Sequence, residues 1–495
     1  MKFLLLLILT VYNLNLFPQR YISGAEIINH RYNNAVWVAT VFNIDFPSSN
    51  RISSSKLKEE IVELFENLAK LNINTVYFQI RSECDAFYPS NIEPVSFWLT
   101  GEQGKSFEGN FDPLEFAISE AKKRNIEFHA WINPYRASAA HGTYNYHKNH
   151  VINLKPELIL DFGKMRLLDP GNPASVQHIL SVINDVVSRY NVDGIHFDDY
   201  FYPYDPQIKN EDLHTFKKYG SGFNNIKDWR RENVHNLIRK THALIKSIKP
   251  NVQFGVSPFG IVSNRAKGTA GLSSYDEIYC DPVVWIQEGI IDYIVPQIYF
   301  EIGHKRADFK IVYDWWAKNH GNVKLIAGLY GSKFYNQSTL NGKNELLEQS
   351  KLILENKSYS GLAFFSYKIL KENSDKLREY LNSSLTKIID CSKLEIPEKP
   401  GKISVINEDG KSYLAWENTN NSNSLSSKFR IFRSKIDDLT GIFPVLLGET
   451  TLNRWEIKLD NTSGGEFEYS VFSVNQCDEQ SELSSNIKLR LKAKQ

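Results

Sequence analysis

The sequence predicts an α/β fold, a (β/α)8 TIM barrel followed by a small all-β immunoglobulin-like sandwich. After residue 35 the chain alternates eight short β-rich runs with helical stretches, the order typical of a parallel barrel. Past Cys391 the helical patterns stop and strand-like segments take over. With 495 residues the chain is too long for one ordinary domain and suits a large domain of about 350–400 residues with a small one.

The barrel strands are expected at the β-rich runs. These are Val36–Phe42, Thr75–Arg81, Glu127–Asn133, Gly194–Asp198, Val252–Ser257, Tyr293–Tyr299, Lys324–Tyr330 and Gly361–Tyr367. Helical patterns are expected at Ser55–Leu71, Asp112–Arg124, Pro173–Tyr190, Asp228–Ser247, Asn344–Asn356 and Lys368–Thr386. A doubly wound open sheet is the alternative, but no GxGxxG motif follows the first run, which weakens it.

Two insertions interrupt the alternation, Phe87–Gly109 after the second run and Ala137–Arg166 after the third. Both follow the carboxyl end of a strand, the end at which barrel enzymes build their active sites. Loops of this length are usually functional, and both contain Gly, Asn, Tyr, His or Trp. We therefore expect them to form the walls of a cleft.

The amino terminus resembles a secretory signal peptide. Met1 and Lys2 precede the apolar run Phe3–Leu9, and no further charge occurs before Arg20. The run is too short for a typical transmembrane helix, so an uncleaved N-terminal anchor is only the alternative. The pattern predicts a signal peptide over residues 1–24 and export to the periplasm, the medium or the cell envelope, with no membrane span after signal removal.

The barrel is expected over residues 34–390, a linker over 391–401 and the sandwich over 402–495. The clearest sandwich strands are Lys402–Ile406, Ser412–Trp416, Lys428–Arg433, Arg454–Leu459 and Glu466–Asn475. Trp416 and Tyr469 resemble the core tryptophan and the strand tyrosine of a fibronectin type III domain. We expect this domain to be a spacer, or to contact a protein or glycan partner, and to carry no catalysis.

Composition excludes several classes of protein. The 58 Lys and Arg against 57 Asp and Glu leave a net charge of +1, so no bulk charge favours nucleic acid. The 4 cysteines are scattered without a CxxC pair, and the HxxH of His147 and His150 lies in a loop without a paired carboxylate, so we expect neither a metal site nor a cofactor. Aromatic residues make up 13% of the chain, which suits both core packing and the stacking of sugar faces.

The strongest chemical signal is the segment Asp193–Tyr200. Because alternate side chains of a strand share one face, Ile195 and Phe197 are expected to face the helices, and His196 and Asp198 the barrel interior. Asp199 and Tyr200 then fall at the carboxyl end of the strand, where barrel enzymes hold catalytic groups. Burial and a second carboxylate raise the pKa of an aspartate, which suits acid–base or nucleophilic work, although Asp199 could instead cap the loop.

Other runs add polar groups to the same mouth. The inward residues are expected to be Tyr77, Gln79, Arg81 and Glu83 in the second run, His129, Trp131 and Asn133 in the third, and Tyr293, Val295, Gln297 and Tyr299 in the sixth. Arg81 and Glu83 either form a structural salt bridge or serve the substrate, with Glu83 as a second carboxylate. Asp276 and Glu277, after the fifth run, are further candidates, although most exposed acids are simply solvated. Ser257 lacks a GxSxG elbow, so a serine hydrolase is not expected.

Six motifs together resemble the glycosyl hydrolase-like 10 family. They are Ala35–Thr40, Asn74–Gln79, Trp131–Arg136, Val192–Tyr202, Phe254–Pro258 and Asp292–Tyr299, within a match from about residue 34 to 384. The resemblance implies a TIM-barrel glycoside hydrolase, of which some bacterial members cut peptidoglycan glycan strands stripped of their peptides. The chitinase pattern DGxDxDxE is present only in part, since His196 and Tyr200 replace its second Asp and its Glu.

The sequence thus predicts an exported glycoside hydrolase that uses two carboxyl groups and no cofactor. Asp198 is the first choice for the nucleophile or base, with Glu83, Asp199 and Asp276 as its possible partners. The expected substrate-binding residues are Gln79, Arg81, Asn133, Tyr135, Arg136, His196, Tyr200, Tyr275, Gln297 and Tyr299. The alternatives are a catalytically silent, glycan-binding barrel that displays its sandwich to a partner, and a metal-dependent deacetylase.

Overall fold

The computed structural model describes residues 33–264, 269–334, 338, 342–356, 360–372, 396–408, 411–417, 426–436, 444–450, 453–457, 465–475, 480–482 and 484–491. The chain divides into two compact units, Asn29–Leu394 and a C-terminal unit that starts at Glu395. The predicted signal peptide, the start of the linker and most of the helix predicted at Lys368–Thr386 lie outside the described residues.

The first unit is a closed barrel of eight parallel strands, which confirms the predicted fold. The strands are β1 (Asn33–Val38), β2 (Thr75–Arg81), β3 (Glu127–Ile132), β7 (Gly194–Phe197), β8 (Gln253–Val256), β9 (Tyr293–Ile294), β10 (Lys324–Leu329) and β11 (Gly361–Phe364). Their order around the barrel is β1-β11-β10-β9-β8-β7-β3-β2, so each strand pairs with its neighbours in sequence and β11 closes onto β1.

Two strands differ most from the predicted runs. The β1 strand stops at Val38, and Val41–Asn43 forms a 3-10 turn, η1, in which Phe42 and Asn43 have positive φ angles of 55° and 50°. The β9 strand is only two residues long because Pro296, which has no N–H, follows closely. The main chain after β9 still forms hydrogen bonds to the neighbouring strand β10, since Gly328 N–H donates to Pro296 O at 2.9 Å.

Aromatic side chains fill the barrel interior, as the alternation along the strands predicted. Trp37, Tyr77, Trp131 and Tyr293 belong to one buried cluster. His196 lies among them, with its ring stacked on Tyr77 at a centroid distance of 4.1 Å. The interior is therefore a packed core, and the reactive groups must lie above it, at the carboxyl ends of the strands.

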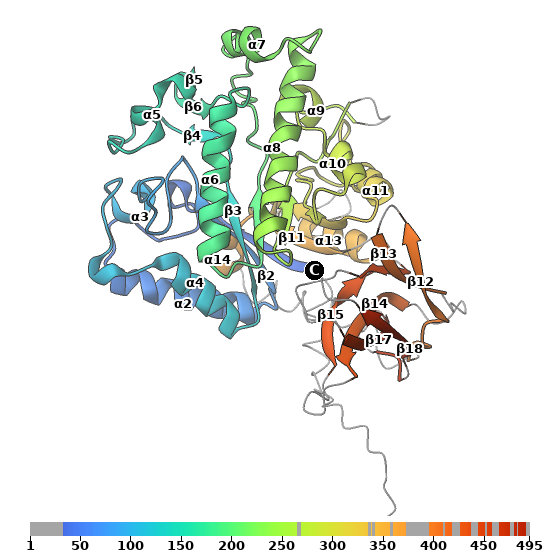
Figure 1. Ribbon diagram of the computed structural model, residues 1–495. Coiled ribbons are helices and arrows are strands. Elements are labelled where there is room, and N and C mark those ends of the chain that lie inside the picture. The colour runs from blue at the N-terminus through green and yellow to red at the C-terminus, as the bar shows by residue number, and fades with distance from the viewer. Residues whose placement is uncertain are drawn as a thin grey trace, which may run out of the picture. The chain divides into compact units, whose positions relative to one another are not determined.

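Helices cover the outside of the barrel (Figure 1). The longer ones are α2 (Ser54–Lys70), α4 (Pro113–Lys123), α6 (Pro173–Arg189), α8 (Ile226–Ile248), α11 (Phe309–Asn319) and α13 (Glu345–Leu354). The α6 helix shows why they form, since Asn172 caps it, Pro173 begins it, and its buried side chains recur every three to four residues. Short helices are α3 (Phe97–Thr100), α5 (Val151–Leu154), α7 (Leu213–Tyr219), α9 (Ser274–Glu277), α10 (Pro282–Glu288), α12 (Gly331–Phe334) and α14 (Tyr367–Glu372).

The second insertion is more ordered than a loop. Its strands β4 (Arg136–Ser138), β5 (Ile159–Phe162) and β6 (Met165–Leu168) form a small antiparallel sheet in the order β4-β6-β5. Figure 1 shows this sheet and α5 at the same end of the barrel as α7. Among the described residues, no helix combines the length and the apolar character needed to cross a bilayer.

The C-terminal unit consists of two antiparallel sheets, as predicted for a sandwich. Strands β12 (Ile403–Glu408), β13 (Lys411–Trp416) and β16 (Arg454–Glu456) form one, and β14 (Ser426–Lys435), β15 (Val445–Thr450), β17 (Gly465–Asn475) and β18 (Ser485–Leu491) the other. Trp416 and Tyr469 share its buried core with Phe429, whose ring meets that of Trp416 edge-on. The sequence did not predict β15 and β18, and the likeness to fibronectin type III stays a prediction.

Candidate active site

Two adjacent aspartates lie at the carboxyl end of β7. Asp198 and Asp199 are only 3% and 5% exposed. Burial raises the pKa of both carboxyl groups, and the charge of Asp199 raises that of Asp198 further. A buried pair with raised pKa values retains a proton at a pH where ordinary aspartates are ionised. This pair is therefore equipped for proton transfer.

A chain of side-chain amides holds Asp198. Gln79 Oε1 accepts from the main-chain N–H groups of Thr40 at 2.8 Å and Val41 at 2.9 Å, Gln79 Nε2 donates to Asn133 Oδ1 at 2.6 Å, and Asn133 Nδ2 donates to Asp198 Oδ2. Since a main-chain N–H can only donate, it fixes the orientation of Gln79, and Gln79 in turn fixes Asn133. Oδ2 of Asp198 is thus an acceptor, and any proton on this carboxyl group resides on Oδ1.

Asp199 is held by Gln297, which follows β9, two strands away from β7 in the barrel. The Gln297 Nε2 group donates to Asp199 Oδ1 and to the main-chain O of Ser257, each at 2.9 Å. Tyr299, on the same segment, is close enough for the charge of Asp199 to raise its pKa, after the larger effect of burial. These two predicted substrate-binding residues therefore adjoin the aspartate pair.

Arg136 provides the positive charge of the site. Its side chain is buried, Nε donates to Ser82 O at 2.9 Å, and the guanidinium lies 4.8 Å from the ring centre of Tyr200. Its charge opposes the rise in the pKa of Asp198, Asp199 and Glu83 that burial causes. Within the described part of the chain, Nη2 of Arg136 is buried and has no hydrogen-bond partner. A donor in this position can bind a ligand oxygen.

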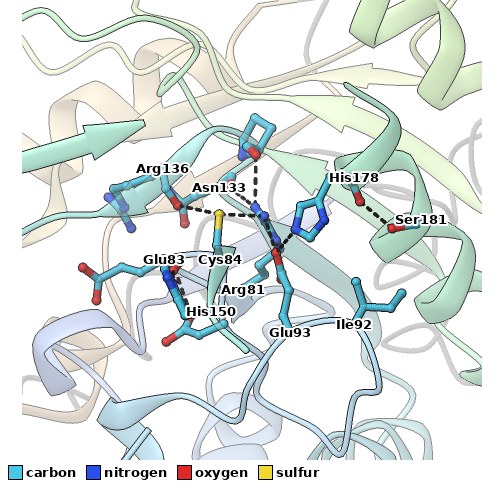
Figure 2. Close-up of polar contacts among 12 residues, drawn as sticks. Arg81, Glu83, Cys84, Ile92, Glu93, Asn133, Arg136, His150, His178 and Ser181 are labelled. Atoms are coloured by element: carbon cyan, nitrogen blue, oxygen red, sulfur yellow. Dashed lines mark hydrogen bonds and ion pairs between the residues drawn. The ribbon is translucent and has the colours of Figure 1, made fainter. Parts of the chain in front are cut away.

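Glu83 lies in the loop after β2 and accepts three hydrogen bonds. Trp98 Nε1 donates at 2.6 Å and Tyr144 Oη at 3.2 Å to Oε2, while the Ala139 N–H donates to Oε1. Burial, followed by the neighbouring Asp85, raises its pKa. Figure 2 shows the Glu83 and Arg136 side chains on one side of the close-up and the Glu93 carboxylate on the other.

The structure does not place Arg81 at the mouth as predicted. A β-bulge between Gln79 and Arg81 shifts the register with β3, so that Arg81 pairs with Ile132 and leaves the inward alternation. Its guanidinium donates twice to Glu93, each bond 2.7 Å long, and Glu93 also contacts His178 at 2.8 Å (Figure 2). The salt bridge left open by the sequence therefore exists, but its partner is Glu93 and not Glu83.

Arg81 supports the site from behind. Its Nη1 donates to the main-chain O of Asn133 at 2.6 Å and of Pro134 at 3.0 Å, and Nη2 contacts Cys84 Sγ at 3.0 Å. These contacts tie the loop after β2 to the loop after β3, which carry Glu83 and Asn133. We assign Arg81 a positioning role in place of the predicted substrate contact.

Two other predicted contacts are sealed off. His196 is fully buried, accepts from Trp37 Nε1 at 3.1 Å and contacts Tyr293 Oη at 3.2 Å, because it lies one layer below Asp198 in the barrel. Burial lowers its pKa well below the ordinary value, so the ring is neutral. Tyr135 is also fully buried. Neither side chain therefore has an exposed surface with which to contact a substrate.

The loop after β8 lies to one side of the aspartates. Asp276 is exposed and lies in the first turn of α9, where its carboxylate accepts from the Oγ of the N-cap residue Ser273 at 3.0 Å. Tyr275 stacks under Arg231, 4.1 Å from the guanidinium, and borders an apolar cavity of about 330 Å³ together with Ile261 and Trp315. The cavity is linked to the aspartate pair through Gln297, whose main-chain O accepts from the N–H of Gly260 on the cavity wall.

The sequence reasoning missed several contacts of the site. Trp98 and Tyr144 come from the two insertions that were expected to form walls, but nothing in the sequence pairs them with Glu83. Tyr204, whose Oη donates to Tyr200 Oη at 2.9 Å, was not singled out. His150 is a buried partner of Glu83 O, at 2.8 Å, and not a solvated histidine. No group of three or more His, Cys, Asp or Glu suited to a metal occurs among the described residues.

Comparison with known proteins now identifies the family. The model of "Glycosyl hydrolase-like 10" matches residues 33–343. The chain belongs to the glycosyl hydrolase-like 10 family. A relative, glycosyl hydrolase YngK of Bacillus subtilis (strain 168), is 38% identical over 366 residues, which are 71% of each chain. Glycosyl hydrolase DigH of Escherichia coli (strain K12) is 39% identical over 304 residues, 57% of this chain and 69% of the relative. As a member of this family, the protein is a glycoside hydrolase.

Solved structures of other glycoside hydrolases resemble this chain at low sequence identity. The endo-β-1,4-mannanase of Thermotoga petrophila has a TM-score of 0.45 and 10% identity and covers 94% of this chain and 98% of its own. The glycoside hydrolase domain of PgaB from Bordetella bronchiseptica has a TM-score of 0.46 and 12% identity and covers 71% and 99%. We transfer no site residue from either structure.

Proposed function

We propose that this glycoside hydrolase is exported and cleaves peptidoglycan glycan strands by a two-carboxyl mechanism. The observation that carries the mechanism is the buried pair Asp198–Asp199, whose pKa values are both raised by burial, that of Asp198 further by the charge of Asp199. Two close carboxyl groups that hold one proton provide an acid and an anion together, which is what an oxocarbenium-like transition state requires.

The roles follow from the contacts. Asp198 has the more strongly raised pKa, and Asn133 occupies its Oδ2, so Oδ1 delivers the proton to the leaving glycosidic oxygen. Asp199, whose Oδ1 is held by Gln297, stays ionised and stabilises the positive charge that develops on the sugar. Water then adds to the anomeric carbon and gives a proton back to the Asp198 carboxylate, which restores the enzyme. This assignment makes Asp198 the acid, in place of the nucleophile or base expected from the sequence.

The substrate class rests on the family resemblance and on the amino-terminal pattern. Some members of the family act on glycan strands without peptides, and residues 1–24 have the pattern of a signal peptide, which directs export across the membrane that the wall surrounds. Arg136 suits an N-acetylated or acidic sugar because its Nη2 has an unused N–H in a buried place.

The test is a panel of glycans given to the purified mature chain. Peptidoglycan glycan strands with and without peptide stems, chitin oligosaccharides and mannan are incubated with the enzyme, and products are read by mass spectrometry. We expect shortened strands with a free reducing end from the peptide-free glycan. Cleavage of mannan alone would contradict the proposed substrate. An anhydro end would contradict hydrolysis.

A further inference from the structure

One aromatic side chain at the mouth is exposed, although burial is usual for so large an apolar ring. Phe42, in η1 after β1, is 44% exposed. Because β1 pairs in parallel with β2, the loop that carries Phe42 lies at the same end of the barrel as the aspartate pair. An isolated exposed apolar residue needs no explanation by itself, but the following contacts show that this one is held in place.

The backbone of this turn is strained. Phe42 and Asn43 both have left-handed φ angles, 55° and 50°, which an asparagine tolerates but a phenylalanine rarely adopts. The turn persists because its neighbours fix it: Asn43 Nδ2 donates to Trp98 O at 2.7 Å, and the Asp45 carboxylate accepts from Ala39 N–H at 2.8 Å. Strain that the surrounding structure maintains is concentrated at functional sites.

The ring is supported by the acidic part of the site. Phe42 packs on Trp98 at a centroid distance of 4.8 Å, and Trp98 is only 8% exposed. Trp98 in turn donates from Nε1 to Glu83 at 2.6 Å. The Phe42 ring thus packs on a fixed indole, tilted to it by 60°, while nearly half of the residue is open to solvent.

The turn is also joined to Asp198. Thr40 and Val41, which lead into Phe42, donate their main-chain N–H groups to Gln79 Oε1, and the amide chain continues through Asn133 to Asp198. Anything that rests on Phe42 is therefore held at a fixed offset from the proposed acid. A sugar subsite needs such a rigid aromatic surface, because the apolar face of a pyranose stacks on a ring.

We propose that Phe42, backed by Trp98, is a stacking platform for one sugar ring of the glycan, on the β1 side of the mouth. The proposal rests on the proposed function for the identity of the glycan. It also names a different part of the site from the aspartates, and it predicts effects on binding in place of effects on the chemical step.

The test measures the affinity for peptide-free glycan strands by titration calorimetry, and kcat and KM by product release. We expect Phe42→Ala to weaken binding about 3–10-fold and to raise KM with little change in kcat, because one stacked ring is lost. Phe42→Trp restores binding to within about twofold, since it replaces the ring. The matched control is Ile44→Ala, because Ile44 is a similarly exposed apolar residue of the same segment, at 42%, but has no ring to stack on a sugar.

Each outcome decides between the two proposals. Binding by Phe42→Ala equal to that of the wild type overturns the platform, and cleavage that continues then leaves the proposed function standing. An equal loss in Phe42→Ala and Ile44→Ala also overturns it, because the effect then belongs to the loop as a whole. Binding that depends on Phe42 without any cleavage supports the platform and contradicts the proposed hydrolysis.

Discussion

Asn133 donates its side-chain N–H to Oδ2 of Asp198, and its own Oδ1 accepts from Gln79 at 2.6 Å. The amide therefore links Gln79 of β2 to the proposed acid, with an orientation that the main chain of Thr40 and Val41 determines. The orientation of the reactive carboxyl group is therefore set through two intervening side chains, those of Asn133 and Gln79. The first prediction follows from this relationship.

Replacement of Asn133 by Ala removes the donor to Asp198 and leaves the carboxyl group free to rotate. We expect kcat to fall by about 10²-fold, as for the loss of one well-placed donor, with a smaller change in KM. The pKa of Asp198 rises further, because a hydrogen bond to the charged form has been removed. Steady-state kinetics over a pH series checks both effects, and an unchanged kcat would show that the amide has no positioning role.

The pH profile depends on the proton that the aspartate pair holds. Activity is expected to fall on the alkaline side, as this proton is lost, at a pH well above the ordinary aspartate pKa of about 3.9. Replacement of Arg136 by Met removes the charge that opposes the rise, so both limbs of the profile should move to higher pH by about one unit or more. A profile of kcat/KM that Arg136→Met leaves in place would contradict this electrostatic role.

The Arg81–Glu93 pair makes a prediction about stability. Glu93→Gln leaves a buried guanidinium without its counter-charge and should lower the free energy of unfolding by about 3–5 kcal/mol in urea denaturation at pH 7. The exposed pair Lys56–Glu59 is the control, and Glu59→Gln should cost less than about 1 kcal/mol.

The same ion pair predicts how the difference in unfolding free energy between wild type and Glu93→Gln depends on pH. Burial alone would raise the pKa of Glu93, but Arg81 and His178 outweigh it and lower the pKa to about 2. The stabilisation is thus complete above the ordinary value near 4.5 and is lost as the pH falls towards 2. The gap between wild type and Glu93→Gln should narrow over that interval, and a constant gap would show that the charge of Glu93 is not the cause.

The strain at Phe42 can be measured by two substitutions that both remove the ring. Glycine adopts a positive φ without strain and alanine does not, so Phe42→Gly should be more stable than Phe42→Ala by about 0.5–1 kcal/mol. At Ile44, where φ is −56°, the order should reverse, because glycine there only adds freedom to the unfolded chain. Thermal unfolding of the four variants gives the comparison, and the same order at both positions would exclude strain.

The sequence predicted the barrel because its strands and helices alternate in hydrophobic period, and it predicted the inward direction of Asp198 because side chains alternate along a strand. The rule of alternating side chains failed at Arg81, because a β-bulge adds a residue to the strand and the hydrophobic pattern of the sequence gives no sign of it. The alternation also placed His196 correctly inside the barrel, but the side chain lies one layer below the mouth, where a substrate contact was expected. Height in the barrel depends on where each strand starts relative to its neighbours.

The contacts between insertions were beyond prediction for a different reason. Trp98 and Tyr144 lie 46 positions apart in the chain and meet only because both loops fold over Glu83. Their composition indicated a cleft wall, but the pairing of two loops depends on packing in three dimensions and not on periodicity. The η1 turn likewise interrupts a run that reads as a continuous strand.

The central claim is that Asp198 and Asp199 carry the chemistry, and the most direct measurement compares Asp198→Asn with Asp276→Asn. Asp276 is the matched control, since it is an aspartate in the loop after β8 but is exposed and bonded to Ser273. On peptide-free glycan strands we expect Asp198→Asn to lower kcat by about 10³-fold or more with binding retained, and Asp276→Asn to stay within about twofold. Equal turnover by Asp198→Asn and the wild type would contradict the account.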